Sequence, residues 1–294
     1  MDSDPSWELY RSYLSVLRGG SLSAAARALG LAQPTVGRHI ETLEGALGLS
    51  LFTRSQLGLM PTPAALELKP YAEAMGSAAA ALMRAAESQG DVKGTVRVTA
   101  SDVIGVEVLP PILAQLQATQ PQLRIELALT NRVQDLLLRE ADIAIRMTQP
   151  TQDALIAQRV GDVELGLYAH ERYLRDRGTP QTLGELLKHS LIGFDEETPF
   201  LRAARKALPA WRREAFALRT DNDLAQLALI RAGAGIGICQ VVLARRNPDL
   251  IRVLAGNFSF VLETWVTMHE DLRHSARCKA TFDALLIGLR SHAT

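Results

Sequence analysis

Residues 21–54 constrain the fold more than any other stretch, because they predict two short helices joined by a tight turn. Ser21 or Ser23 can cap the first helix, and Gly30 supplies the left-handed residue that ends it. Pro34 suits the first turn of a second helix, where no amide donor is needed. Along one face of that helix, apolar residues recur at helical spacing: Val36, Ile40, Leu43 and Leu47.

The opposite face of the predicted second helix is polar and carries Gln33, Thr35, Arg38 and His39. Short polar side chains near a helix start, with an arginine one turn later, can meet base edges and phosphates in the major groove of DNA. An ordinary helical hairpin with a solvated polar face is the alternative. Between Leu9 and Ile40 there are four arginines and no Asp or Glu, which favours a surface that faces phosphate.

The charge of the whole chain limits how strongly one copy can hold DNA. The chain balances 32 basic against 32 acidic residues. Over residues 1–54, five acids cancel the four arginines and Arg54. We therefore expect affinity to come from several copies acting together.

A small β-wing is predicted after the two helices. Residues 48–54 read as a short strand, Ser55-Gln56 with Gly58 as a polar turn, and the residues up to Pro61 as a return strand. Arg54 would then lie at the edge of the wing, where it suits a phosphate or the minor groove. A surface arginine in a loop is the alternative.

An alanine-rich helix is predicted over residues 64–88, with a seam typical of a dimerising coiled coil. Pro70 removes a backbone hydrogen bond and is expected to kink or divide this helix. Packing of the helix on its own domain is the alternative. The seam residues follow one another at spacings of 4, 3, 4, 3 and 4, and are Leu68, Ala72, Met75, Ala79, Leu82 and Ala86.

The remainder alternates between predicted strands and helices, which indicates a mostly parallel sheet covered on both faces. Strands are expected at 95–100, 123–129, 142–146, 165–169, 191–194, 216–220, 235–239 and 260–268. Helices are expected at 106–119, 133–140, 183–189, 222–232, 241–246 and 276–290. Two α/β lobes of about 100 residues each would leave a cleft between them as the natural ligand site.

Polar side chains follow several of these strands, where helix N-termini offer free amide donors. Hydroxyls, an amide and an arginine so placed suit a small organic acid, with one aromatic residue as an apolar wall. Simple helix capping is the alternative for the short polar residues, and Glu140 or Asp142 could equally hold the arginine. The candidate ligand residues are Thr99, Ser101, Asp102, Thr130, Asn131, Arg146, Phe194 and Asp221.

Several classes of protein lack support in the sequence. No apolar run approaches the roughly 20 residues that cross a bilayer, and the first residues lack the basic and apolar regions of a signal peptide, so we expect a cytoplasmic protein without a membrane partner. Cys239 and Cys278 have no metal-ligand spacing and are expected to be reduced and buried. The six histidines are scattered and no nucleophile and base pair emerges. Gly233, Gly235 and Gly237 lead from a helix into a strand, the reverse of a phosphate loop. We expect no enzyme, metal or cofactor.

Taken together, these motifs resemble the LysR-type transcriptional regulators over nearly the whole chain. The N-terminal part is similar to the family signature through Gly20-Ser21-Leu22-Ser23-Ala24-Ala25-Ala26, Leu29, Gln33-Pro34-Thr35-Val36, Ile40, Leu43-Glu44, Leu47-Gly48, Leu51-Phe52, Arg54 and Thr62. The later part agrees more loosely, at Gly94, Leu109-Pro110, Pro121, Ala141-Asp142, Leu167-Tyr168-Ala169, Tyr173-Leu174 and 232–237. Gly37 stands where the family usually has serine, and Ala65 replaces a usual glycine.

The resemblance implies an α/β protein with an N-terminal all-α winged helix-turn-helix and a two-lobed effector domain like the periplasmic binding proteins. We expect a DNA-binding domain at 1–63, a dimerisation helix at 64–90 and an effector domain at 91–294, with lobe 1 at about 91–163 and 265–294 and lobe 2 at about 164–264. It also implies a homodimer or dimer of dimers that binds palindromic double-stranded DNA, responds to a small organic effector and contacts RNA polymerase. The expected DNA contacts are Ser23, Gln33, Pro34, Thr35, Arg38, His39 and Arg54.

Two other hypotheses remain at this point. A cytoplasmic small-molecule-binding protein could use its N-terminal helices for a protein partner. An enzyme on a binding-protein-like fold would need turnover that survives loss of residues 1–90.

Overall fold

The computed structural model of the chain describes residues 4–55, 58–86, 92–131, 140–150 and 155–292. The chain divides into two compact units, of which Met1–Ala86 forms nearly all of the first. The domain boundaries expected from the sequence stay predictions.

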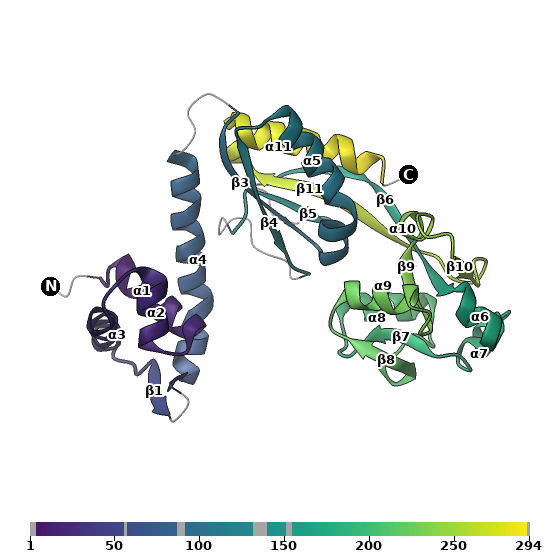
Figure 1. Cartoon of the computed structure of the whole chain (residues 1–294), viewed down its shortest axis with the longest axis horizontal. Coiled ribbons are helices and arrows are strands. Elements are labelled where there is room, and N and C mark those ends of the chain that lie inside the picture. Colours follow the sequence, from purple (N-terminus) through teal and green to yellow (C-terminus); the bar gives the residue numbers. More distant parts are fainter. Residues whose placement is uncertain (1–3, 56–57, 87–91, 132–139, 151–154, 293–294) are drawn as a thin grey trace. The chain divides into compact units, whose positions relative to one another are not determined.

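The first unit contains the predicted pair of helices and the wing (Figure 1). Ser21 caps the helix Leu22–Leu29, since the Ala24 N–H donates to the Ser21 Oγ at 3.2 Å. Gly30 ends that helix with a φ of 67°. The predicted helix-turn-helix is therefore confirmed, and the wing strands pair antiparallel from Phe52 opposite Pro61. An additional helix, Trp7–Gly19, precedes this pair and was not expected from the sequence. The elements are α1 (Trp7–Gly19), α2 (Leu22–Leu29), α3 (Gln33–Leu47), β1 (Phe52–Ser55), β2 (Gly58–Pro61) and α4 (Pro63–Ala86).

A single apolar core holds these helices together, with Val16, Val36 and Leu43 fully buried in it. The Tyr13 hydroxyl donates to the Ala65 carbonyl, and burial raises the pKa of Tyr13 to about 12. Ala65 is itself fully buried, and its N–H donates to Thr62 Oγ1 at 3.2 Å. Alanine is thus accommodated at this junction between the wing and α4.

Helix α4 runs unbroken from Pro63 to Ala86, so the expected division at Pro70 is wrong. Pro70 is exposed, where water can satisfy the carbonyl freed one turn earlier. The predicted seam splits between two environments. Leu68 and Ala72 pack on the core of the first unit, whereas Met75 and Leu82 are 41% and 68% exposed.

The second unit is built on one continuous sheet with the strand order β4-β3-β5-β11-β6-β9-β7-β8, and β10 pairs with β6. Strands β4, β3 and β5 are parallel, as are β8, β7 and β9, while β11 and β6 are antiparallel to their neighbours. Two parallel blocks, the lobes, are therefore joined by long strands that pass from one to the other (Figure 1). The strands are β3 (Gly94–Ala100), β4 (Leu123–Leu129), β5 (Ile143–Arg146), β6 (Leu155–His170), β7 (Leu191–Phe194), β8 (Phe216–Thr220), β9 (Ile236–Gln240), β10 (Leu250–Val253) and β11 (Phe260–His269).

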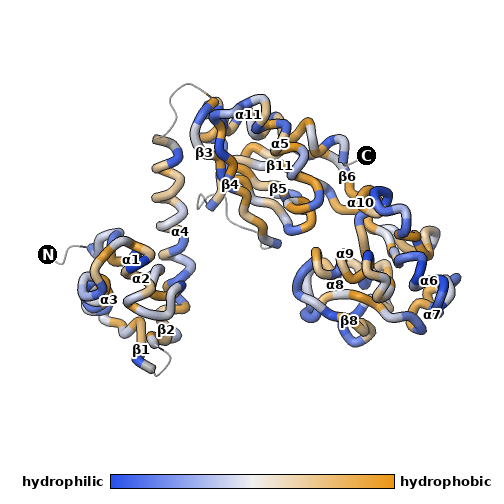
Figure 2. The backbone as a smooth tube through the Cα atoms, in the orientation of Figure 1, coloured by the Kyte–Doolittle hydropathy of each residue, from blue (hydrophilic) through white to orange (hydrophobic). Residues whose placement is uncertain are grey.

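Helices cover the sheet, and hydrophobic residues concentrate along its strands (Figure 2). The α-helices are α5 (Leu109–Thr119), α6 (Glu171–Arg177), α7 (Leu183–Leu186), α8 (Pro199–Ala207), α9 (Asp223–Arg231), α10 (Val241–Ala244) and α11 (Ala276–Arg290). Shorter turns of other helix types are η1 (Ile104–Val108), η3 (Arg213–Ala215) and η4 (Glu270–His274).

Most predicted elements are confirmed, several of them to the residue. Strands at 123–129, 191–194 and 216–220 and the last helix at 276–290 have the expected bounds. The strand expected at 165–169 is only the end of the longer β6, whose first half is less buried and includes exposed polar residues. Helices α6 and α8 and strand β10 were not anticipated, and the helix expected at 133–140 falls almost wholly outside the described residues.

Replacing Gly37 with alanine is expected to stabilise the first unit. Gly37 has ordinary helical backbone, and an added Cβ would meet only Leu22 Cδ1 at 3.6 Å. We expect a gain of about 1 kcal/mol, which slows amide exchange over 21–54 about fivefold in hydrogen–deuterium exchange of the full chain. Gly58→Ala is the control, since its φ of 117° and a Cβ only 2.7 Å from the Gly20 carbonyl predict faster exchange. Equal exchange in Gly37→Ala and the native chain would contradict this.

Candidate functional site

The polar face of α3 is exposed on the first unit. Gln33, Pro34 and Arg38 are exposed and Thr35 is partly exposed, while the apolar face of the helix is buried. The Ser23 hydroxyl donates to Gln33 Oε1 at 3.1 Å, which ties the start of α3 to α2. The structure thus brings five of the expected DNA-contact residues together on one surface.

His39 has a different environment from the other residues of that face. Its Nδ1 lies 2.7 Å from the Oγ of Ser12, which is 1% exposed in α1. The imidazole is therefore oriented by the neighbouring helix as well as being partly exposed. By contrast, Arg38 and Arg54 are exposed and form no ion pair with any other described residue.

A cavity of about 450 Å³ lies between the two lobes of the second unit. Six of the eight predicted ligand residues line it: Ser101, Thr130, Asn131, Arg146, Phe194 and Asp221. The other two lie one step behind its wall. Thr99 is fully buried and accepts a hydrogen bond from Arg146 Nη2 at 3.1 Å, and Asp102 is bonded to Asn131.

Arg146 ends β5 and reaches the cavity with two of its donors already used. Its Nη1 donates to the Ile145 carbonyl at 2.8 Å, in addition to the bond to Thr99. These contacts hold the guanidinium in a fixed orientation at the cavity wall. The carboxyl ends of the parallel strands β3, β4 and β5 thus bring the predicted polar groups together, as the sequence pattern indicated.

A polar cluster crosses the cavity from one lobe to the other. Asn131 Nδ2 donates to Asp223 Oδ2 at 2.9 Å, and Asn222 Nδ2 donates to Asp102 Oδ2 at 3.3 Å. Burial, together with the nearby charge of Asp102, raises the pKa of Asp223 to about 6. Asp223 was missed in the sequence, although its neighbour Asn222 carries the signal of a helix cap.

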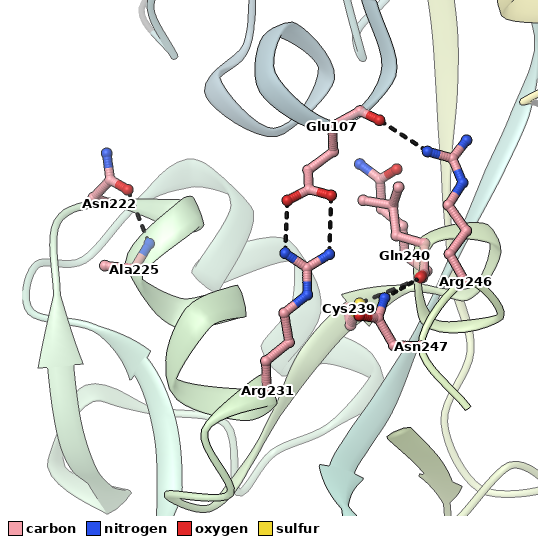
Figure 3. A network of polar contacts seen from close by, with 9 residues as sticks. Glu107, Asn222, Ala225, Arg231, Cys239, Gln240, Arg246 and Asn247 are labelled. Carbon is pink, nitrogen blue, oxygen red and sulfur yellow. Dashed lines mark hydrogen bonds and ion pairs between the residues drawn. The ribbon is translucent and has the colours of Figure 1, made fainter. Parts of the chain in front are cut away.

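A second tie between the lobes is an ion pair that joins η1 to α9 (Figure 3). Arg231 donates from both Nη atoms to the two carboxylate oxygens of Glu107, at 2.7 and 2.9 Å. This bond holds the pKa of the Glu107 carboxyl below its ordinary value, and Arg246 Nη1 donates to the Glu107 carbonyl at 2.8 Å. Its partners are 124 residues apart, so no local pattern could reveal it.

The two cysteines are buried and free of disulfides, as expected. Cys239 lines the cavity, and burial raises the pKa of its thiol to about 12, so the thiol is protonated. Within the described part of the chain, no group of three or more His, Cys, Asp or Glu side chains could hold a metal ion. The described helices also include none that is long and apolar enough to cross a membrane.

A winged helix-turn-helix followed by a long helix and a two-lobed α/β unit with a cavity is the combination of parts expected of a DNA-binding regulator. Residues 7–66 match the model of the bacterial regulatory helix-turn-helix proteins of the lysR family, and residues 89–290 match the LysR substrate binding domain. The chain therefore belongs to the LysR family of DNA-binding transcriptional regulators.

Relatives of established class agree with this assignment over most of their length. The chain is 27% identical over 288 residues to the probable HTH-type transcriptional regulator LtrA of Klebsiella pneumoniae, covering 93% of this chain and 91% of the relative. The fold is similar to that of CbnR, a LysR family transcriptional regulator, with a TM-score of 0.67 at 19% identity, covering 98% of this chain and 99% of CbnR. AphB, a virulence activator of Vibrio cholerae, matches at a TM-score of 0.63 and 20% identity over 96% of this chain and 99% of AphB.

These findings confirm the resemblance to the LysR family and the α/β fold class with an N-terminal helix-turn-helix. They also confirm the prediction that the chain is a transcriptional regulator and not an enzyme. The individual DNA-contact and ligand residues stay predictions.

Replacing Asp223 with asparagine is expected to change how stability depends on pH. Because the folded-state pKa of Asp223 is raised from 3.8 to about 6, its contribution is fully present below pH 3.8 and is lost as the pH rises through 6. Asparagine imitates the protonated acid, so the variant should nearly match the native chain below pH 4 and exceed it by about 3 kcal/mol at pH 7.

Thermal melts of both chains at several pH values measure this difference. Burial lowers the pKa of His292 to about 4, so the titration of His292 makes the protein more stable as the pH rises through a similar range. Both chains share this effect, so the difference between their melting curves isolates Asp223. A difference that is constant with pH would contradict the assigned cause.

Proposed function

We propose that this LysR-type regulator binds its promoter site as an oligomer and alters that binding when a small molecule fills the cavity between the lobes. The observation that carries this proposal is the cavity itself, since its wall includes groups from both lobes and the Asn131–Asp223 bond spans it. A ligand seated there contacts both lobes at once. It would therefore shift any equilibrium in their relative position by its difference in affinity for the two positions.

The exposed face of α3 supplies the proposed major-groove contacts. Gln33 and Thr35 lie at the start of the helix, where they would meet base edges, and Arg38 follows one turn later, where it would contact a phosphate. Arg54 on the wing and Ser23, which contacts Gln33, complete the surface with Pro34. His39 is proposed to contribute through the position of the helix, because its ring is held by Ser12.

We also propose a cytoplasmic location, where the double-stranded DNA partner lies, and RNA polymerase as the partner when the regulator acts at a promoter. Footprinting on the DNA upstream of its own coding sequence tests the function directly. Protection of a palindromic stretch, altered when the cavity is filled, supports the proposal. If no DNA is protected, the N-terminal helices serve a protein partner.

Replacing Arg38 with alanine is expected to weaken DNA binding and to flatten its dependence on salt. An arginine that contacts phosphate releases about one counterion per bound copy, so the slope of log affinity against log salt should fall by about one per copy. A mobility-shift titration at several salt concentrations measures both effects. Arg175→Ala is the control, since it removes the same charge from α6, where Arg175 pairs with Glu171. Unchanged binding by the Arg38 variant would contradict the assignment of α3.

The exposed side of α4 is proposed as the dimer contact. Tyr71, Met75 and Leu82 are 73%, 41% and 68% exposed, and with the exposed Ala78 they follow one another at spacings of 4, 3 and 4. This is the spacing of a coiled-coil seam. It retains Met75 and Leu82 from the seam predicted in the sequence but replaces Leu68 and Ala72, which face the core of their own unit.

Replacing Leu82 with glutamate is expected to dissociate the oligomer, because a charge in an apolar seam must be desolvated without a partner. Sedimentation velocity at micromolar concentration should show a loss of at least tenfold in association. Leu66→Glu is the matched control, since Leu66 is 54% exposed but lies about 160° around the helix from Leu82. Dissociation by both variants, or by neither, would contradict this face of α4 as the contact.

A further inference from the structure

The wall of the cavity between the lobes is mainly apolar. Phe194 and Phe200 pack edge to face, with ring centroids 6.2 Å apart, and Phe200 continues this group to Phe260 at 5.7 Å. Such a wall favours the flat, apolar body of a ligand by burial of its surface. The apolar lining consists of Val103, Met147, Leu165, Phe194, Pro199, Phe200, Leu227, Ile238, Leu243 and Leu262.

Gln226 has an unsatisfied donor in this wall. The side chain lines the cavity from α9 and is only 7% exposed, yet its Nε2 has no hydrogen-bond partner among the described residues. Nearly all buried polar groups in folded proteins are paired, and leaving one unpaired is costly. An unpaired amide on a side chain that lines a ligand cavity is a group whose missing partner a ligand oxygen can supply.

The charges around the cavity disfavour an anion. Among the lining residues that the structure describes, Arg146 is the one cation, and two of its donors are taken by Ile145 and Thr99. Asp221 and Asp223 line the same cavity, and Asp102 lies directly behind it. An anionic ligand would therefore meet more acid than base.

We propose that the cavity takes an uncharged, mainly aromatic ligand whose carbonyl-type oxygen accepts a hydrogen bond from Gln226 Nε2. This inference rests on the proposed function, because it names the chemical class of the effector for the same cavity. It replaces the expectation of a small organic acid that the strand-end residues suggested. Gln226 positions the ligand by its oxygen, and the apolar wall holds the ring.

Three fluorinated probes that share one ring test this proposal: 4-fluorophenylacetamide, 4-fluorophenylacetate and 4-fluorophenethylamine. Binding to the full chain is followed by fluorine NMR at pH 7.5. We expect the amide to bind with millimolar affinity or better and the carboxylate to bind at least tenfold more weakly.

Two variants of Gln226 separate ligand recognition from a structural role. Gln226→Leu removes the unpaired donor, so it should weaken the amide about tenfold while raising the Tm of the free protein by about 2 °C or more. Gln226→Glu replaces the donor with an acceptor. The native chain should bind the amide more tightly than the amine, and the variant should bind the amine more tightly than the amide. A residue with only a structural role would not exchange ligand preference in this way.

The ligand class is overturned if the carboxylate binds as tightly as the amide, if no probe binds, or if Gln226→Leu keeps the affinity for the amide. The proposed function fails separately. If the amide binds with the expected dependence on Gln226 but leaves the DNA footprint unchanged, the ligand class stands and the coupling to DNA does not.

Discussion

The antiparallel pairing of β6 with β11 is the constraint on which the second unit depends. The two strands pair from Phe260 opposite Leu165 to His269 opposite Leu155, and this ladder makes one sheet of two parallel blocks. The register shifts between Thr264 and Trp265, where Gly161 and Arg159 are their partners and Val160 is left between them. A bulge of this kind bends a strand locally. The lobes are therefore joined through a ladder that bends at one place and is continuous elsewhere.

Polar contacts across the cavity add to the β6–β11 ladder in joining the lobes. The Glu107–Arg231 pair and the contacts of Asn131 with Asp223 and of Asn222 with Asp102 all join the lobes at a distance from the bulge. The Glu107–Arg231 pair is partly shielded from water, so it is worth more than an exposed surface pair. A ligand that fills the apolar interior changes the packing between these ties. Under the proposed function, the cavity and its polar contacts act together in setting the position of the lobes.

Local signals explain which parts of this structure were visible in the sequence. Ser21 and Gly30 act within their own turns, so the helix-turn-helix could be predicted from neighbouring residues alone. The ends of β3, β4 and β5 share one edge of a parallel block, which is why Ser101, Thr130 and Arg146 could be placed around a cavity from strand bounds. The pairing of His39 with Ser12 and of Glu107 with Arg231 depends on how distant elements pack. No periodicity records such packing.

Two glutamines in the cavity show how strongly such packing decides function. Gln240 and Gln226 are each 7% exposed and line the same cavity, so neither residue type nor burial distinguishes them. Gln240 Oε1 lies 2.9 Å from the Nε2 of His292, which burial keeps neutral by lowering its pKa to about 4. That oxygen is therefore engaged by the C-terminal segment at any pH well above 4. The Gln226 amide has no such partner among the described residues, and a buried donor of this kind is retained at a cost in stability that a ligand can offset.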